Sequence, residues 1–295
     1  MSNSKICSLY PDYFSVTIPP VMAETHTEAP VAEHHAHTLY GEEIFSIGNF
    51  HVTNSVFTSW LAFLVILAIA ISAVSKKRLI PKGIQNIFEI VIEELLKLCD
   101  SVTQNRRISE LALPIVLSLV IFVLINNWIG LIPGVGSIMI ETAHGPVALL
   151  RGATADLNTT LVLAVVSVVF ANFVGVFSVG AWNTFTKFIR IPVLLRLRKV
   201  FKDPVQLVLV PVDIFVGLLE LLGEVAKIAS LSFRLFGNIF AGEVLIASMA
   251  AIFAYFTPLP FVFLEFFVGI IQAFIIGLLT VVYVTLAVQT HDESH

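Results

Sequence analysis

Residues 230–243 read SLSFRLFGNIFAGE and lie inside an apolar segment that runs from Pro204 to Phe256. Arg234 and Glu243 fall within the quoted stretch, and three further charged residues precede it in the same segment: Glu220, Glu224 and Lys227. A charged side chain at the centre of a bilayer costs about 2.5–3.5 kcal/mol. Charges at these positions therefore indicate a hydrated path or a partner surface. For Arg234 this reading is favoured over a snorkelling or structurally paired arginine.

The composition is typical of a helical membrane protein with several spans. Of the 295 residues, 57% are hydrophobic and only 13% are charged, and a soluble core has no need of apolar runs this long. The sequence therefore predicts an all-α polytopic fold. The two cysteines, Cys7 and Cys99, fall in segments expected on opposite sides of the membrane, so the sequence predicts neither a disulfide nor a thiolate metal site.

Five membrane segments are predicted from apolar runs of bilayer length. They are expected at about residues 55–74, 111–132, 160–180, 204–256 and 261–289. Asp156 or Asn158 can cap the third. The fourth must tilt strongly or break, because roughly 50 helical residues reach about 75 Å. A turn at Thr257–Pro260 joins it to the last segment, and the two are expected to form a long, tilted helical hairpin.

Two regions outside the spans have their own patterns. Apolar residues at steps of three and four predict an amphipathic helix at about 82–104, lying in the membrane interface. Residues 1–54 form a polar segment, rich in His and Glu, ahead of a membrane domain at 55–295. We interpret this segment as a solvated external tail rather than a weak metal site. Its prolines argue against a cleaved signal peptide.

The positions of lysine and arginine predict the orientation. Of the 17 basic residues, seven lie in 76–111 and six in 181–203. By the positive-inside rule these loops are cytoplasmic and the N-terminus is outside, and five crossings leave the C-terminus in the cytoplasm. We interpret the basic loops as topology signals, so no nucleic-acid partner is expected.

Helical spacing distributes the charged residues of the fourth segment over two faces. At 100° per residue, Glu220, Lys227 and Arg234 form one slowly drifting stripe. Glu243, nine residues beyond Arg234, points to the opposite side. A hydrated path that reaches one face need not join a path that reaches the other. Lys227 is expected to pair with Glu224 or Glu220 within the helix rather than to relay protons.

The last segment carries a second polar stripe, formed by Glu265, Gln272 and Tyr283. If the last two segments pack antiparallel, Glu243 and Glu265 lie at roughly similar distances from the turn. Two carboxylates in one aqueous pocket could share a proton and exchange it near neutral pH. The alternative is that each bonds to a different neighbour. Arg234 cannot relay a proton, because guanidinium stays charged, but it can attract a carboxylate and block proton hopping.

Several motifs, in the same order, resemble those of subunit a of F-type ATP synthases. The most specific is SFRLFGN at Ser232–Asn238, followed by AGE at Ala241–Glu243. NNWIGLIP at 126–133 is similar to the end of that family's second helix, and ADLN at 155–158 to the start of its third. Gln272-Ala273-Phe274 and Tyr283 fit its last helix. The resemblance covers nearly the whole chain from about residue 50.

This resemblance implies a proton-translocating stator subunit with two offset half-channels that serve a rotating ring of c subunits. Arg234 would face the ring, hold its passing carboxylates deprotonated and separate the half-channels. Glu220 would lie near the cytoplasmic half-channel. The residues implied for the outer half-channel are Glu243, Glu265, Asn238 and Gln272. The secondary candidates are Lys227, Tyr283, Asp156 and Asn158. Some relatives carry histidine at the Glu265 position. Here Glu243 and Glu265 are both acidic, so no imidazole relay is expected and proton transport could depend differently on pH.

The remaining expectations follow from the same resemblance. The partners would be the c-ring, the peripheral-stalk b subunits and the lipid bilayer, and the translocated ion would be H⁺, with Na⁺ as the alternative. The expected location is an energy-transducing membrane, the bacterial inner membrane, and no cofactor, metal or covalent chemistry is expected. A stand-alone channel or secondary transporter is the competing class, and it would predict internal repeats that the sequence lacks. An assembly scaffold would leave Arg234 and Glu243 unexplained.

Overall fold

The computed structural model describes residues 40–47, 50–75, 83–132, 134–135, 138–142, 145–179, 204–253 and 256–289. All of them belong to one unit of the chain, Thr38–His295. The predicted His-rich tail up to residue 39, the basic cluster at 76–78, the basic loop at 181–203 and the C-terminal residues 290–295 lie outside the described residues.

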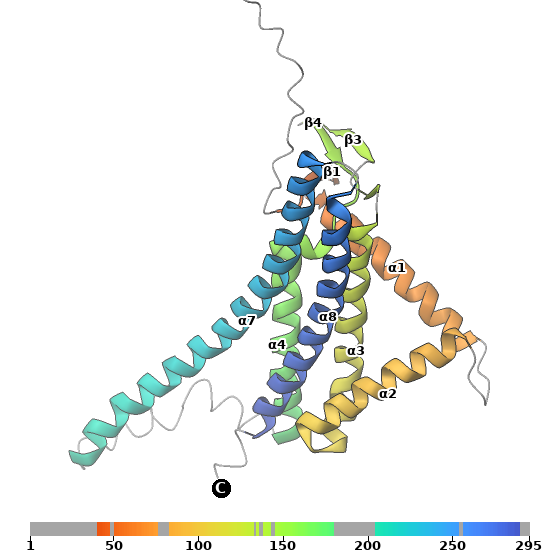
Figure 1. The fold of residues 1–295 in the computed structure, drawn as a ribbon. Coiled ribbons are helices and arrows are strands. Elements are labelled where there is room, and N and C mark those ends of the chain that lie inside the picture. Colours follow the sequence, from red (N-terminus) through yellow and green to blue (C-terminus); the bar gives the residue numbers. More distant parts are fainter. Residues whose placement is uncertain are drawn as a thin grey trace, which may run out of the picture. The chain divides into compact units, whose positions relative to one another are not determined.

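The described part of the chain is mainly helical (Figure 1). Its helices are α1 (Asn54–Ser75), α2 (Ile84–Thr103), α3 (Arg106–Leu131), α4 (Leu157–Val179), α7 (Pro204–Ile252) and α8 (Pro258–Gln289), with a short 3₁₀ helix η2 (Ala153–Ala155) before α4. All of the α-helices except α2 are long and apolar enough to cross a membrane. The predicted all-α polytopic class with five membrane segments is therefore confirmed.

The amphipathic helix predicted at 82–104 is α2. Leu95 and Cys99 are buried on one face, and Cys99 lies in an apolar cluster with Val116 of α3 and Val281 of α8. On the outer face Ile87 is 61% exposed. One apolar stripe is thus used for packing while the rest of the helix surface stays accessible. Its position in the membrane interface stays a prediction.

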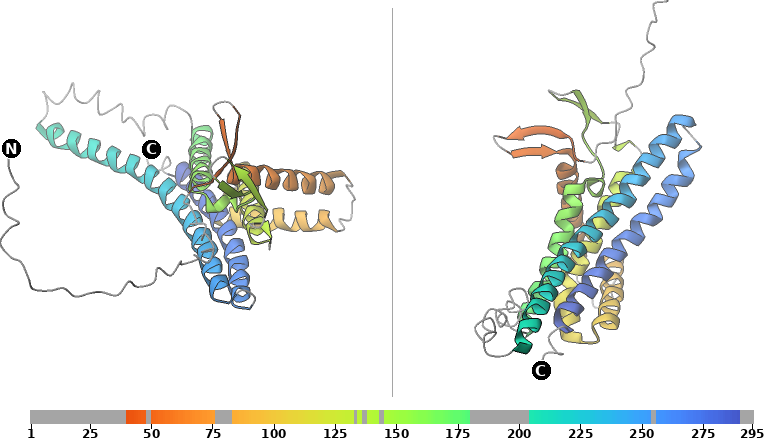
Figure 2. Two further views of the ribbon diagram at one scale, coloured as in Figure 1. Left: turned by 90° about the horizontal axis from the view of Figure 1, so that it is seen from above. Right: turned by 90° about the vertical axis from the view of Figure 1, so that its left-hand side faces the viewer.

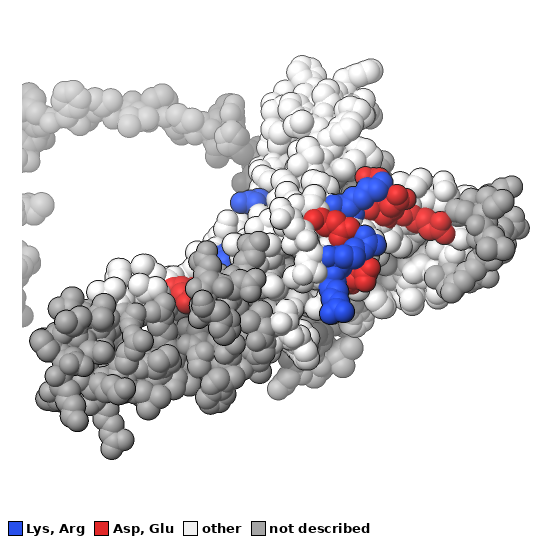
Figure 3. Space-filling view, turned by 90° about the horizontal axis from the view of Figure 1, so that it is seen from below, with Lys and Arg blue, Asp and Glu red and all other residues white. Residues whose placement is uncertain are grey.

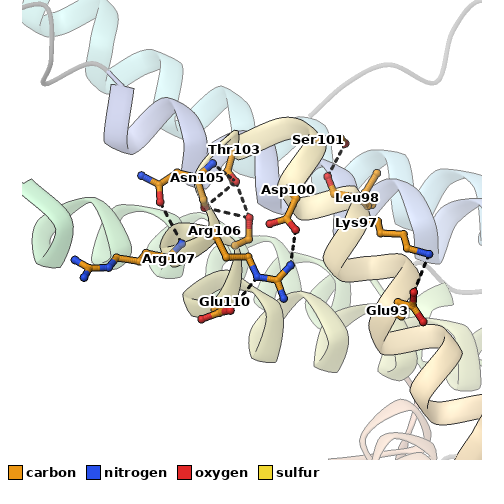
Figure 4. A network of polar contacts seen from close by, with 11 residues as sticks. Glu93, Lys97, Leu98, Asp100, Ser101, Thr103, Asn105, Arg106, Arg107 and Glu110 are labelled. Carbon is orange, nitrogen blue, oxygen red and sulfur yellow. Dashed lines mark hydrogen bonds and ion pairs between the residues drawn. The ribbon is translucent and has the colours of Figure 1, made fainter.

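A sharp turn joins α2 to α3 (Figure 4). Gln104 adopts a left-handed backbone conformation at φ 52°, and its amide donates to the Asp100 carbonyl. The Asn105 side chain accepts a hydrogen bond from the Arg107 amide and so caps α3. Because of this cap, α3 begins at Arg106, earlier than the membrane segment predicted from residue 111.

Charged side chains gather at the same turn, as the view from below shows (Figure 3). The exposed ones are Glu93, Glu94, Lys97, Arg106, Arg107 and Glu110. Arg106 bridges Asp100 at 2.6 Å and Glu110 at 2.9 Å. The Ser109 hydroxyl and then the Arg106 guanidinium hold the pKa of Asp100 below its usual range. Burying this many charges among lipid acyl chains would cost much free energy. This end of the helices therefore belongs in water.

Helices α3, α4 and α8 pack together, and α7 lies against α4 and α8 (Figures 1 and 2). Hydroxyl pairs join them: Ser167 with Thr280 at 2.7 Å between α4 and α8, and Thr160 with Ser232 at 3.2 Å between α4 and α7. In a bilayer such groups have no water to bond, so they must pair inside the protein. These pairs therefore help to fix how the helices align.

Helix α7 is unbroken over 49 residues, about 74 Å at 1.5 Å per residue. Of the two predicted alternatives, a tilt accommodates this length, and Figure 1 shows α7 sloping away from α4 and α8 toward its N-terminus. Leu218 and Leu222 are more than half exposed, whereas Leu231 and Leu235 are each 2% exposed. The C-terminal half of α7 is therefore packed more tightly against the bundle than its N-terminal half.

The turn before α8 lies earlier in the sequence than predicted, because α7 ends at Ile252 rather than at Phe256. Helix α8 begins at Pro258, so Pro258 and Pro260 belong to its first turn rather than to the predicted turn at Thr257–Pro260. Proline fits there because the first helical residues have amide groups without intrahelical partners, and proline lacks that amide. The prediction of the turn was therefore wrong at both ends.

Two antiparallel β-hairpins, which the sequence analysis did not predict, lie at the end of the helices that also carries the α7–α8 turn (Figure 1). One pairs β1 (Glu43–Ile47) with β2 (Phe50–Thr53), in a region expected to be a solvated tail; the other pairs β3 (Met139–Thr142) with β4 (Gly145–Ala148). Asn54 connects them, because its side chain accepts from the Glu42 amide and donates to the Ala148 carbonyl. The hairpins thereby fix the loop that follows β4.

Asn127 offers a test of how interhelical polar contacts stabilise the fold. Its side-chain amide donates to the Gly269 carbonyl of α8 at 3.2 Å, and its oxygen accepts from the Thr154 hydroxyl at 2.7 Å. We expect Asn127→Leu to lower the free energy of unfolding by about 1–3 kcal/mol, because the buried Thr154 hydroxyl loses its acceptor and the bond to α8 is lost. Thermal unfolding in detergent measures the effect.

Asn126 is the matched control. It is equally buried, but its amide donates only to the Phe122 carbonyl of its own helix, and its side-chain oxygen has no partner. Asn126→Leu should therefore change stability much less. Equal losses for the two variants would contradict the assigned role of Asn127.

Candidate functional site

Arg234 lies on the exposed side of the central part of α7. Ser230 and Asn238, one turn before and after it, are exposed as well. On the opposite side of the same turns, Leu231 and Leu235 pack into an apolar cluster with residues of α3, α4 and α8. The packing of the two leucines therefore fixes where the guanidinium leaves the helix.

Arg234 carries a charge without an ionic partner in the described part of the chain, where no carboxylate lies within ion-pair distance of it. Tyr283 of α8 is close enough for its hydroxyl to interact electrostatically with the guanidinium. A cation that is exposed at membrane depth is costly unless an anion or water meets it. The arrangement thus presents a permanent positive charge to a group outside this chain.

Glu243 and Glu265 lie close together. Glu265 is 6% exposed on α8, and its carboxylate rests against Gly242, where a β-carbon would overlap it. Gly242 directly precedes Glu243 on α7, so the Glu265 carboxylate lies beside the residue next to Glu243. Of the two Glu265 oxygens, Oε1 is buried without a hydrogen-bond partner. Packing of α7 on α8 therefore brings together the two carboxylates that the sequence analysis considered as a pair.

A cation lies beside this pair that was not predicted from the sequence. Arg151, in the loop after β4, places its Nε 3.6 Å from Oε2 of Glu243, and its side chain is only 12% exposed. Its isolation was the available signal, because Arg151 is the one basic residue between 133 and 157, a stretch that the positive-inside rule leaves almost free of cations.

The other residues predicted for the outer half-channel are placed differently. Gln272 is buried on α8, two turns after Glu265. Asn238 is exposed on α7, between Arg234 and Glu243. None of the contacts among the described residues joins Asn238 to the carboxylate pair. Gln272 thus lies in the interior of the bundle and Asn238 on its surface.

Asp156 and Asn158 have separate positions at the start of α4. The Asp156 carboxylate accepts a hydrogen bond from the Asn158 amide at 3.0 Å and is 2% exposed. Asp156 is therefore the helix cap of the two predicted alternatives. The side chain of Asn158 is exposed.

A second polar region lies between α4, α7 and α8, around a cavity of about 240 Å³. Glu220, Lys227 and Tyr283 line it, together with Glu224 and Asn172. Lys227 donates to Glu224 at 2.6 Å, which confirms the pairing predicted within the helix, and its Nζ lies 5.7 Å from the centre of the Tyr283 ring.

Asn172 of α4 was not predicted as a member of this region. Its side-chain amide donates to the Glu224 carboxylate at 3.2 Å. An amide side chain in the interior of a membrane helix was the signal that could have identified it.

An apolar cluster separates the two polar regions. It contains Leu231 and Leu235 of α7 and Ile276 of α8, and Arg234 lies at the same level of α7. From Glu220 to Glu243 the helix rises about 35 Å. Protonatable groups thus occur on both sides of the cluster, and a fixed cation lies at its level.

Comparison with known proteins identifies the family of the chain. A family model described as ATP synthase A chain matches residues 56–285. Proteins named ATP synthase subunit a are similar over most of their length. The protein from Syntrophobacter fumaroxidans is 34% identical over 255 residues, 86% of this chain and 92% of the relative. The protein from Mycobacterium marinum is 32% identical over 271 residues, with coverage of 90% and 96%. The protein from Campylobacter concisus is 30% identical over 235 residues, with coverage of 80% and 89%. The resemblance read from the motifs is therefore confirmed, and the chain belongs to the ATP synthase A chain family.

Proposed function

We propose that this chain is the proton-translocating stator subunit of an F-type ATP synthase, providing two offset half-channels to a rotating c-ring. Family membership supports the role. The observation that carries the mechanism is Arg234, which presents a fixed charge between two polar regions separated by an apolar cluster. The competing reading, a stand-alone channel or secondary transporter, has no support from the family.

The outer half-channel begins at the hairpin end of the helices. A proton arriving there is taken up by the Glu243–Glu265 pair, whose close approach suits the sharing of one proton. Gln272 continues the polar route along α8. Asn238, on the exposed side of α7, lies where the route would open toward a c subunit. From there the proton passes to a c-subunit carboxylate, which then enters the lipid in neutral form.

The inner half-channel receives the proton after the ring has turned. Its polar cavity holds Glu220 and Glu224, with Lys227 paired to Glu224 and Tyr283 beside it. These groups give a departing proton hydrogen-bonding partners on its way to the cytoplasm.

Arg234 keeps the two routes apart. An adjacent positive charge favours the ionised form of a c-subunit carboxylate, so the carboxylate loses its proton to the inner route before it reaches the outer one. Guanidinium does not release its own proton, so it cannot carry protons across the barrier. Each proton crossing is worth about 2.3 kcal/mol per 100 mV, which a leak at this point would waste.

The remaining parts of the proposal follow from the family. The chain performs no covalent chemistry, its protein partners are the c-ring and the peripheral-stalk b subunits, and H⁺ is the cargo, with Na⁺ as the alternative. The host membrane is the bacterial inner membrane. The N-terminus is outside and the C-terminus cytoplasmic, which agrees with the charged α2–α3 turn lying at the end away from the hairpins.

Substitution of Arg234 tests the barrier. In inverted vesicles that contain the whole complex, we expect Arg234→Ala to reduce ATP-driven acidification to background while the complex still assembles. Passive proton permeability, measured after the catalytic sector is removed, should stay at or above the wild-type value, because the routes remain and only the barrier is lost.

The control for this experiment is Arg107→Ala, since Arg107 is an exposed arginine at the start of α3, far along the helix from the cluster. It should pump at the wild-type rate. Pumping that survives in Arg234→Ala would reduce Arg234 to a structural residue.

Gly242 tests the role of the carboxylate pair. A β-carbon at this position would overlap the Glu265 carboxylate, so Gly242→Ala must displace that side chain. Because small misplacements of reacting groups cost up to about 100-fold in rate, we expect ATP-driven pumping to fall by about 10-fold or more at normal assembly.

Gly217→Ala provides the matched control. Gly217 lies on the same helix as Gly242, and a β-carbon there would meet no atom within 4 Å. A pumping rate in Gly242→Ala that equals that of Gly217→Ala would place Glu265 outside the proton route.

A further inference from the structure

Arg151 is held in place by contacts to elements other than α7. Its backbone amide donates to the Thr58 hydroxyl of α1 at 3.2 Å. Its guanidinium donates to the Tyr40 carbonyl before β1 at 3.2 Å and to the Ala155 carbonyl of η2 at 3.5 Å. The cation is therefore fixed by the hairpin end of the structure, independently of the helix that carries the carboxylate it faces.

The loop that carries Arg151 lies directly against Glu243. Besides the ion pair at 3.6 Å, a β-carbon on Gly152 would lie 3.1 Å from the other carboxylate oxygen of Glu243. Arg151 and Glu243 are 12% and 23% exposed, so solvent screens their attraction only in part. A fixed cation thus faces a carboxylate that itself neighbours Glu265.

We infer that Arg151 is a positioning residue of the outer half-channel, whose fixed charge orients the Glu243 carboxylate and sets the external pH range over which the Glu243–Glu265 pair takes up protons. The inference rests on the proposed function. Arg151 itself transfers no proton, because guanidinium does not deprotonate. It acts through Glu243.

Among the described residues, the elements packed around the pair contribute few other groups that could set this range. Helix α8 contributes Glu265, with Tyr283 further along, and the described part of α4 contains no titratable residue. The loop around η2 contributes Arg151 and Asp156, and the Asp156 carboxylate is engaged in the cap of α4. In the described part of the chain, Arg151 is therefore the one cation within ion-pair distance of either carboxylate.

The sign of its effect follows from electrostatics. A neighbouring cation favours the ionised carboxylate, so its removal lets the pair keep a proton to higher pH. In ATP synthesis the pair must be protonated from outside, and the rate falls when the external pH is too high. Loss of the charge should therefore move this alkaline limit upward, by about one pH unit for a close cation.

The test uses the whole complex reconstituted in liposomes. The ATP-synthesis rate per assembled complex is measured under a constant diffusion potential while the pH on the hairpin side is varied. We expect Arg151→Gln to shift the alkaline half-point upward by about one unit. Arg151→Lys should restore most of the wild-type profile because it retains the charge, and Arg107→Gln should leave the profile unchanged.

A second variant covers the case in which Arg151→Gln does not assemble. Arg151→His is charged below about pH 6.5 and neutral above it. Its profile should follow the wild type at low pH and depart upward at high pH. If the pH profile of Arg151→His ran at a constant offset from the wild-type profile, or coincided with it at every pH, the inference would be overturned.

Failure of the inference and failure of the proposed function give different results. If Arg234→Ala stops pumping but the Arg151→Gln profile coincides with the wild type, only the role of Arg151 is wrong. If Arg151→Lys is displaced as far as Arg151→Gln, the guanidinium shape rather than its charge matters, and the inference is also overturned. If Arg234→Ala pumps normally, the proposed function itself fails.

Discussion

The cost of placing charge at membrane depth governs where the polar groups of this chain lie. Most of them meet this cost inside the chain: Lys227 and Asn172 bind Glu224, and Arg151 faces Glu243. Arg234 is different, since no carboxylate of the described residues neutralises it. A subunit that functions alone would not retain such a cation on an apolar surface, whereas a subunit that works against a carboxylate on a moving partner requires it.

The architecture keeps this cation in one place while leaving it accessible. Leu231 and Leu235 anchor the middle of α7 in the α3–α4–α8 bundle, and the N-terminal end of the helix slopes away from the bundle. A helix buried on all sides could not present Arg234 to a partner, and a helix exposed on all sides could not hold it at a constant level. The tilt of α7 satisfies both requirements, and it also places the two polar regions at different depths.

The sequence predicted the helices well because apolar length and 3.6-residue periodicity are local properties. The cap at Asn105 and the prolines at the start of α8 moved helix ends, since capping depends on a few side chains rather than on hydropathy. The hairpins were missed because strands of four or five residues leave almost no periodic signal. The contact of Arg151 with Glu243 was missed for another reason: it joins distant parts of the chain through tertiary structure.

The two arginines near the proton route show why residue type alone does not assign a role. Both carry a permanent charge and neither can relay a proton. Arg151 is fixed by the Thr58 hydroxyl and by the carbonyls of Tyr40 and Ala155, and it faces a carboxylate of its own chain, so its charge acts on a static group and can only tune it. Arg234 is exposed and without an ionic partner in the described residues, so its charge can act on carboxylates that arrive and leave. The same guanidinium chemistry thus adjusts proton uptake at one position and enforces the direction of transfer at the other.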